Sequence, residues 1–369
     1  MSNIRRYFER VMREEDGGIV SFILYILSVL YGLIQRTRAF LYERGMLRVE
    51  RVGSRVISVG NITTGGTGKT PAVMSIAEAA KRFTVHGSRF KVAILTRGYR
   101  GKAKGINPVS DGSKILLGCR DAGDEPYLMA KKLSGIPVIK GNDRCLSAKF
   151  AEERFGSDLF ILDDGFQHLK LHRDINILLV DATDPFGNGH ILPRGILREP
   201  LESMRRADIV VLTKTDLSKR NTEIMNKIKR YNTTAPIFVG NYRSLGLVDM
   251  KGNIIEVNRL KGKSLLIFSG LANHSSFRFI LEREGAKVSG ELIYPDHFDY
   301  SKKDIDEIVK KAGDMGTDMI VTTEKDIVKI PYSDLETQIW ALSIEFIIED
   351  GERWESLLFS KKQSGGGNN

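Results

Sequence analysis

Short apolar runs alternate along most of the chain with longer segments whose apolar residues recur at helical spacing. Continuous apolar strands that alternate with amphipathic helices are typical of a mostly parallel sheet with helices on both faces. The pattern therefore predicts an α/β fold. The runs that predict buried strands are residues 56–59, 92–95, 136–139, 159–162, 175–180, 209–212 and 237–239, and helix-like segments between them include 72–83, 125–133 and 145–155.

The pattern changes near residue 240. Residues 242–260 alternate polar and apolar positions around a turn signal at Lys251-Gly252-Asn253, which favours a β-hairpin-like linker. A second strand and helix pattern then begins at residue 264. We therefore expect two α/β/α domains, a larger one over residues 41–240 and a smaller one over 241–362. The Gly- and Asn-rich tail, 363–369, is expected to be disordered.

The N-terminal region departs from this pattern, because residues 17–35 include no charged residue. A membrane-spanning helix needs about 20 apolar residues, so the run IVSFILYILSVLYGLI at 19–34 could span a bilayer or lie in its interface. A buried core helix is the alternative. We expect residues 1–40 to form a membrane-anchor helix. The larger arginine group follows the run, which predicts a cytoplasmic body: Arg36, Arg38, Arg44, Arg48, Arg51 and Arg55.

Composition adds two constraints. The 369 residues carry a net charge of +10, spread along the chain. Such a surface suits nucleic acid, anionic lipid or phosphorylated substrates, and composition alone does not choose among them. The two cysteines, Cys119 and Cys145, provide neither a disulfide framework nor a spaced set of metal ligands, which favours a reducing compartment.

A glycine-rich segment, TTGGTGKTP at 63–71, lies between a predicted strand and a predicted helix. Its glycines let backbone N–H groups turn toward a polyphosphate, Lys69 can reach the terminal phosphates, and the Thr70 hydroxyl can hold Mg²⁺. The general phosphate-loop (P-loop) pattern has Gly at position 63, where this chain has Thr. The alternative is a turn that binds nothing. The predicted nucleotide-binding residues are Thr63, Thr64, Gly65, Gly66, Thr67, Gly68, Lys69 and Thr70.

Two further segments carry candidate metal and phosphate ligands. The apolar strand at 159–162 ends in Asp163 and Asp164, where P-loop proteins place a carboxylate beside Mg²⁺. We predict Asp163 as the ligand and leave Asp164 open. Adjacent opposite charges such as Arg198 and Glu199 are usually solvated. They could also form a clamp in which Arg198 balances phosphate charge and Glu199 approaches the metal.

The remaining candidates allow two interpretations each. Asp124 stands before Glu125-Pro126, so its carboxylate either caps a helix or accepts a proton from a substrate hydroxyl. His297 gains interest only if the fold brings it near Asp124. Residues 213–216, TKTD, resemble the element with which GTPases read guanine, although no Asp-x-x-Gly follows the 159–162 strand. A membrane-associated P-loop GTPase is therefore the alternative function.

Several segments in one order resemble the tetraacyldisaccharide 4′-kinase family, the lipid A 4′-kinases of Gram-negative bacteria. Thr at position 63 fits this family's version of the phosphate loop. The matching segments are VISVGNITTGGTGKTP (56–71), LTRGYRGK (95–102), DAGDEP (121–126), GNDR (141–144), LDDGFQH (162–168), LPRGILREP (192–200), PDHF (295–298) and TTEKD (322–326).

The resemblance implies a P-loop NTPase-like first domain and transfer of the ATP γ-phosphate, with Mg²⁺, to the 4′-hydroxyl of tetraacyldisaccharide 1-phosphate. It also implies that Asp124 takes the hydroxyl proton while His297 tunes or orients it, and that Lys69 and Arg198 neutralise charge. The expected partners are this glycolipid and the cytoplasmic face of the inner membrane, with no nucleic acid. A soluble ATP-dependent ligase would leave the anchor unexplained.

Overall fold

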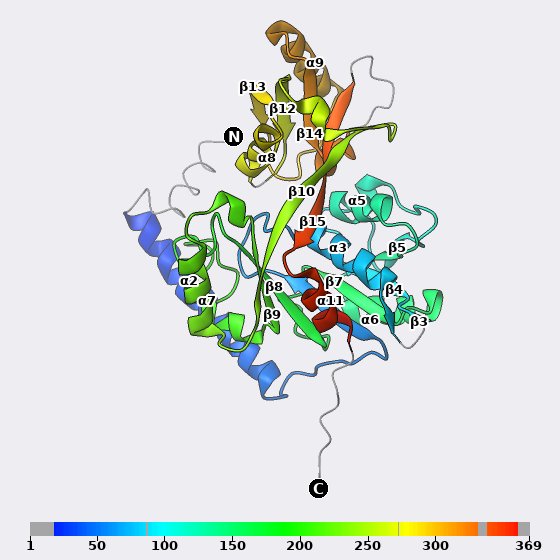
Figure 1. The fold of residues 1–369 in the computed structure, drawn as a ribbon. Helices are drawn as coiled ribbons and strands as arrows, with labels where there is room; N and C mark the ends of the chain where they lie inside the picture. The colour runs from blue at the N-terminus through cyan, green and yellow to red at the C-terminus, as the bar shows by residue number, and fades with distance from the viewer. Residues whose placement is uncertain (1–17, 86–87, 272, 331–337, 361–369) are drawn as a thin grey trace.

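One 13-stranded sheet runs through both lobes of the molecule (Figure 1). The computed structural model describes residues 18–85, 88–271, 273–330 and 338–360; the predictions for residues 1–17 and 363–369 lie outside this range. The strands of the sheet are β1 (Arg55–Gly60), β4 (Val92–Thr96), β5 (Asn107–Ser110), β6 (Val138–Lys140), β7 (Leu159–Asp163), β8 (Ile175–Asp181), β9 (Ile209–Thr213), β10 (Ile237–Asp249), β11 (Ile254–Ile255), β12 (Ser264–Ser269), β13 (Lys287–Ile293), β14 (Met319–Thr323) and β15 (Ile339–Ile348). A separate hairpin joins β2 (Thr84–Val85) to β3 (Ser88–Arg89).

Helices cover this sheet in both lobes (Figure 1). α9 begins with a capping box, in which the Ser301 side chain and the Asp304 side chain each accept a backbone N–H of the other residue. The α-helices are α2 (Ile19–Glu43), α3 (Lys69–Arg82), α4 (Cys119–Ala122), α5 (Asp124–Lys132), α6 (Arg144–Phe155), α7 (Asn221–Tyr231), α8 (His274–Arg283), α9 (Lys302–Met315), α10 (Glu324–Ile327) and α11 (Gly351–Phe359). Short 3₁₀ turns are η1 (Leu201–Arg206), η2 (Thr215–Leu217) and η3 (Val257–Leu260).

The centre of the larger lobe is a buried parallel sheet. β1 pairs in parallel with β7 on one side and with β8 on the other. Every residue of β7 and β8 is buried. Strands with both faces covered have continuous apolar sequences, which is why the sequence pattern identified them. The α/β class is confirmed.

The long strands β10 and β15 connect the two lobes (Figure 1). They pair antiparallel from Gly240 to Asp249 of β10, while β10 also pairs in parallel with β9. Beyond Asp249 the chain turns back into β11, which forms the hairpin that the sequence pattern predicted. Because the two strands run from one lobe into the other, the sheet is continuous rather than divided at residue 240.

The chain returns to the larger lobe at α11, which corrects the assignment of all of 241–362 to the smaller domain. The Phe359 ring lies 5.1 Å from the Phe83 ring, and the Trp354 ring lies 5.3 Å from the Phe238 ring. These side chains belong to the largest hydrophobic core of the larger lobe. The apolar face of α11 is therefore buried there, although its sequence follows the smaller lobe.

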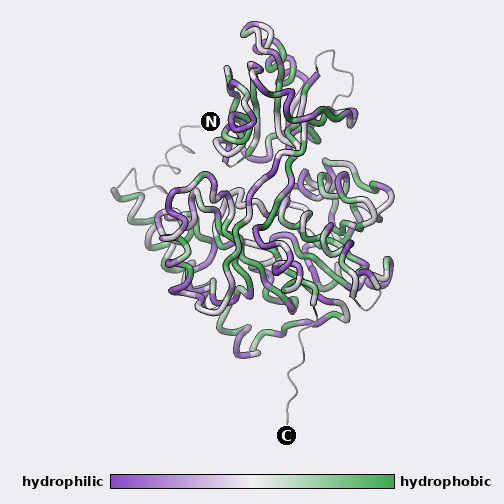
Figure 2. Tube along the Cα trace, viewed as in Figure 1, coloured by the Kyte–Doolittle hydropathy of each residue, from purple (hydrophilic) through white to green (hydrophobic). Residues whose placement is uncertain are grey.

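Helix α2 lies along the outside of the larger lobe (Figure 2). Leu24, Ser28 and Gly32, one helical turn apart, are its buried residues. The Ser28 hydroxyl donates to the carbonyl oxygen of Ile191 at 2.7 Å, so this narrow stripe contacts the lobe. A core helix would be covered all round. Instead, large apolar side chains are exposed, which argues against the core-helix alternative: Ile19, Phe22, Ile23, Ile26, Leu30, Leu33 and Ile34.

Candidate functional site

A cavity of about 1040 Å³ gathers residues from both lobes and from α2. Phosphate-loop residues 64–71 line one side of it. Asp296, His297 and residues 323–325 come from the smaller lobe, and Tyr31, Gln35 and Arg38 come from α2. The cavity is therefore complete only where the three parts of the chain meet.

The phosphate loop connects the end of β1 to the start of α3. Gly68 caps α3 in the left-handed conformation, with φ of 85°, and a Cβ built there would lie 2.0 Å from the Tyr242 hydroxyl. Only glycine suits this position. Lys69 Nζ donates to Asn61 Oδ1 at 3.2 Å. Thr63, in contrast, is buried and bridges to Leu197 in the backbone, so it supports the loop without lining the cavity.

The TKTD segment at 213–216 packs against the backbone of the phosphate loop. Lys214 Nζ donates to the carbonyl oxygen of Gly66 at 2.8 Å and pairs with Asp181. The Asp216 carboxylate accepts a hydrogen bond from Arg283 of α8 at 2.8 Å and does not line the cavity. The carboxylate that would read guanine in a GTPase is thus engaged by the smaller lobe.

Asp163 presents an unsatisfied carboxylate oxygen beside the phosphate loop. Its Oδ2 accepts a hydrogen bond from the Thr96 hydroxyl at 2.9 Å, whereas its buried Oδ1 has no partner among the described residues. Burial, followed by the charges of Glu125 and Asp164, raises the pKa of Asp163 to about 7. A cation at Oδ1 would supply the missing partner, so Asp163 fits a metal ligand.

Asp164 is already paired with two cations. Arg198 Nη1 lies 3.0 Å from both of its carboxylate oxygens, and Lys69 Nζ lies 3.4 Å from Oδ1. Burial alone would raise the pKa of Asp164, but Lys69 and Arg198 hold it below its usual value. Of the two strand-end carboxylates, Asp163 is therefore the better metal ligand.

Glu199 does not lie with Asp163 and Asp164 beside the phosphate loop. Its carboxylate is buried against Arg206 and does not line the cavity, whereas the neighbouring Arg198 does. Although they are adjacent in the chain, Arg198 and Glu199 therefore face different surroundings. Among the described residues there is no group of three or more His, Cys, Asp or Glu side chains suited to a metal. Mg²⁺ commonly takes one or two carboxylates plus phosphate and water, which such a site still allows.

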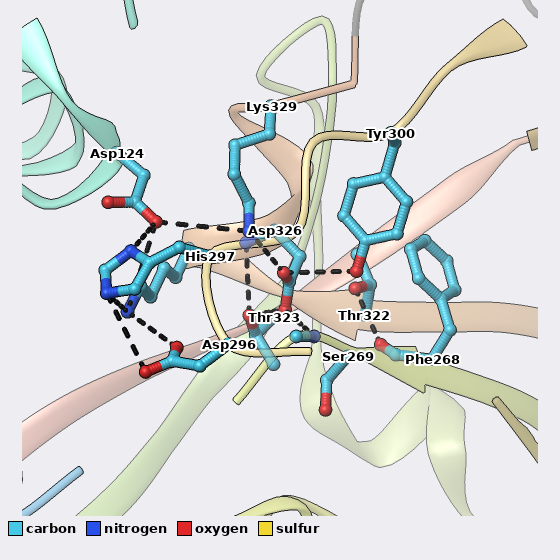
Figure 3. Close-up of polar contacts among 12 residues, drawn as sticks. Asp124, Phe268, Ser269, Asp296, His297, Tyr300, Thr322, Thr323, Asp326 and Lys329 are labelled. Carbon is cyan, nitrogen blue, oxygen red and sulfur yellow. Dashed lines mark hydrogen bonds and ion pairs between the residues drawn. The ribbon is translucent and has the colours of Figure 1, made fainter. Parts of the chain in front are cut away.

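Asp124 and His297 meet across the two lobes (Figure 3). His297 Nδ1 lies 2.7 Å from Asp124 Oδ2. The N-cap of α5 is Gly123, and no side chain caps this helix; Asp124 is its first residue. Its Oδ1 accepts the backbone N–H of Glu125 at 2.9 Å, whereas its Oδ2 contacts His297, so contacts at the start of the helix account for only one of the two carboxylate oxygens.

Two lysines of the smaller lobe surround this pair. Lys325 Nζ lies 3.0 Å from Glu125 and 4.0 Å from Asp124, and Lys329 Nζ lies 3.9 Å from Asp124. Burial alone would raise the pKa of Asp124, but the hydrogen bond from His297 and the two ammonium groups hold it below its usual value. Sequence reasoning assigned no role to these lysines, although Lys325 lies in the TTEKD segment.

The cavity also contains cationic and neutral groups that sequence reasoning did not assign. His168 lines it, and burial together with nearby Arg144 lowers the pKa of His168 to about 4, so its ring is neutral at pH 7. The segments LTRGYRGK and GNDR contained the signal for most of the cationic groups. Besides Arg198, the arginines that line the cavity are Arg38, Arg97, Arg100 and Arg144.

A P-loop between a parallel strand and a helix, with strand-end carboxylates beside it, defines a P-loop nucleotide-binding protein. The sequence matches the family described as tetraacyldisaccharide-1-P 4′-kinase over residues 20–363, and the chain belongs to this family. The resemblance found in its motifs is confirmed.

Similar proteins cover nearly the whole chain. The tetraacyldisaccharide 4′-kinase of Desulfatibacillum aliphaticivorans is 38% identical over 99% of this chain and 100% of its own length. The Syntrophus aciditrophicus protein of the same name is 39% identical over 98% of each. A crystal structure of LpxK from Aquifex aeolicus in complex with ATP is 35% identical, with a TM-score of 0.75 over 92% of this chain and 99% of that one.

Proposed function

We propose that this protein is a kinase that transfers the ATP γ-phosphate to the 4′-hydroxyl of tetraacyldisaccharide 1-phosphate in lipid A biosynthesis. One observation carries the proposal: the hydrogen-bonded pair Asp124–His297 lies in the same cavity as Lys69 and the phosphate loop. A candidate proton acceptor and the phosphate loop therefore share one cavity. Membership of the kinase family and the ATP complex of a relative support the choice of reaction.

Different residues of the cavity would bind the phosphates and the metal. The loop N–H groups, Lys69 and Arg198 would bind the phosphates and stabilise charge on the transferring group. Asp163 and Thr70 would hold Mg²⁺, which when bound neutralises phosphate charge. We leave Glu199 out of this set because its carboxylate pairs with Arg206.

Asp124 would act as the general base. Its carboxylate stays ionised at neutral pH, since its pKa is held low, and His297 Nδ1–H orients it. As the 4′-oxygen bonds to the γ-phosphorus, the bond from that phosphorus to the β,γ-bridging oxygen breaks and ADP leaves. The hydroxyl proton passes to Asp124.

The direct test is incubation of the purified full-length protein with labelled ATP and tetraacyldisaccharide 1-phosphate. Label should appear in the lipid fraction, and GTP should be a poorer donor, because Asp216 is paired with Arg283. Nucleotide hydrolysis that is independent of the lipid, or a preference for GTP, would instead support the GTPase alternative.

The Asp163→Asn variant is expected to need more Mg²⁺. Replacing one anionic ligand with an amide should raise the Mg²⁺ concentration for half-maximal activity by about tenfold or more. A magnesium titration of turnover measures this change. Asp158→Asn, beyond the other end of β7, is the matched control and should titrate like the wild type. An unchanged titration for Asp163→Asn would move the metal role to Asp164.

We also propose that the exposed face of α2 binds the cytoplasmic surface of the inner membrane. The same helix contributes Tyr31, Gln35 and Arg38 to the cavity, so a lipid substrate could keep its acyl chains in the bilayer while its sugar enters the site. The absence of a nucleic-acid partner stays a prediction.

The triple variant Phe22→Ser, Leu30→Ser, Leu33→Ser is expected to release the protein from membranes. Each CH₂ withdrawn from lipid costs about 0.8 kcal/mol, while the buried stripe of α2 stays intact. Flotation with phospholipid vesicles measures the binding, and ATP binding should not change. Leu245→Ser with Ile254→Ser, exposed in the smaller lobe, is the control. Equal flotation of all variants would contradict a membrane role for this face.

A further inference from the structure

A buried ion pair lies behind the Asp124–His297 pair (Figure 3). Lys329 Nζ is 2.8 Å from Asp326 Oδ1 and 3.9 Å from Asp124 Oδ2. The side chains of Lys329 and Asp326 are only 4% and 0% exposed. One buried ammonium therefore stands between a carboxylate of the smaller lobe and a carboxylate of the larger lobe.

Asp326 is anchored independently of Lys329. Its Oδ2 accepts hydrogen bonds from the Thr323 hydroxyl at 2.6 Å and from the Gly270 N–H at 3.2 Å. Its Oδ1 accepts from the Tyr300 hydroxyl at 3.2 Å. Three donors from different parts of the smaller lobe thus fix this carboxylate, and the Lys329 ammonium lies against it in an ion pair, with no hydrogen-bond partner among the described residues.

Stability alone does not explain an ion pair at this place. Removing two charges from water is costly, and apolar residues of similar volume often stabilise a core as well or better. Lys329 also does not line the cavity, so it does not reach a nucleotide there. The catalytic group within its range is Asp124.

We propose that Lys329, held by Asp326, is a positioning residue that orients the Asp124 carboxylate across the lobe boundary and keeps it charged. This inference rests on the proposed kinase function. Lys329 acts through Asp124, whereas Asp124 itself accepts the proton of the substrate hydroxyl. The lysine belongs to the smaller lobe, so its effect on Asp124 depends on the two lobes being together.

The groups that face Asp124 determine the sign of the expected pH effect. They are His297, Lys325, Lys329 and the Cys119 thiol, whose pKa burial and the charge of Asp124 raise to about 11. The thiol is therefore neutral over the working range. Removing the Lys329 charge should raise the pKa of Asp124, so a higher pH would be needed to ionise the base.

The test compares Lys329→Met, Asp326→Asn and the double variant in the full-length protein, with kcat/KM for the lipid measured from about pH 5 to pH 9. Lys329→Met should shift the acid limb of the kcat/KM profile to higher pH by roughly one unit. This shift is equivalent to a tenfold loss of kcat/KM at low pH, which recovers as the pH rises. The KM for ATP should not change. Asp326→Asn keeps the lysine charge and should not move the limb upward.

The double variant separates positioning from simple charge pairing, and it leaves neither member of the pair buried alone. If Lys329 acts on Asp124, the limb stays displaced in the double variant. If Lys329 only neutralises Asp326, the double variant returns to the wild-type profile, which would overturn the inference. An active wild type with an unshifted Lys329→Met limb would overturn it too. A wild type that does not phosphorylate the lipid would overturn the proposed function itself.

Discussion

Lys69→Ala is expected to lose about 10²–10³-fold in kcat, the scale for removing one preorganised group that stabilises transition-state charge. Lys69 is the first residue of α3, and its Nζ lies 3.4 Å from Asp164 Oδ1. The terminal phosphates of a bound nucleotide would lie beside this ammonium group. Single-turnover phosphorylation of the lipid, with saturating ATP, measures the loss. Thermal unfolding should change little, because Asp164 keeps its contact with Arg198.

Lys81→Ala is the matched control for this prediction. Lys81 lies in the last turn of the same helix, α3, and does not line the cavity. Its replacement removes an equal charge from the same element and should leave kcat near the wild-type value. A folded Lys69→Ala variant that also kept near wild-type kcat would refute the assignment of the phosphate loop.

Asp124→Ala and His297→Ala are each expected to lower kcat by about 10²–10⁴-fold, the usual contribution of a general base. The two side chains hydrogen-bond at 2.7 Å, and neither belongs to the phosphate loop. The KM for ATP should therefore change little. Steady-state kinetics with each substrate varied in turn would measure both effects.

The double variant tests whether the two residues act as a unit. Losses of groups that depend on each other are not additive, so the double variant should be barely worse than the poorer single variant. Multiplicative losses would count against the coupling. Asp304→Asn, in the capping box of α9, is the control for a helix-end carboxylate: it should lower stability and leave kcat unchanged. If Asp124→Asn behaved in the same way, Asp124 would be a structural carboxylate only.

Fully buried strands could be predicted from the sequence, whereas partly exposed strands could be predicted only in part. β7 and β8 are buried along their whole length, so their apolar runs were visible without a structure. β10 is different: the sequence pattern predicted a short strand at 237–239 and a separate extended run from residue 242, because the middle positions of β10 are half-buried or exposed. The placement of α11 in the larger lobe depends on contacts with Phe83 and Phe238, which no local pattern contains.

The candidate site shows the same division. Residues 64–70 are contiguous, and the chemistry of a phosphate loop depends on local backbone conformation, so a single segment was enough to identify them. Asp124 and His297 are 173 positions apart, and spacing alone favoured a helix cap as the role of Asp124. Arg198 and Glu199 formed one predicted clamp, yet only Arg198 reaches the cavity.

The amino-acid sequence by itself determined the α/β class, the phosphate loop, the apolar N-terminal helix and the kinase family, because each depends on local periodicity or on contiguous motifs. Only the tertiary structure decided which carboxylate is left unsatisfied beside the loop, that Asp216 is paired with Arg283, and that Lys329 stands behind Asp124. Those properties arise from burial and from charges brought together across the lobes, and no segment of the chain carries them alone.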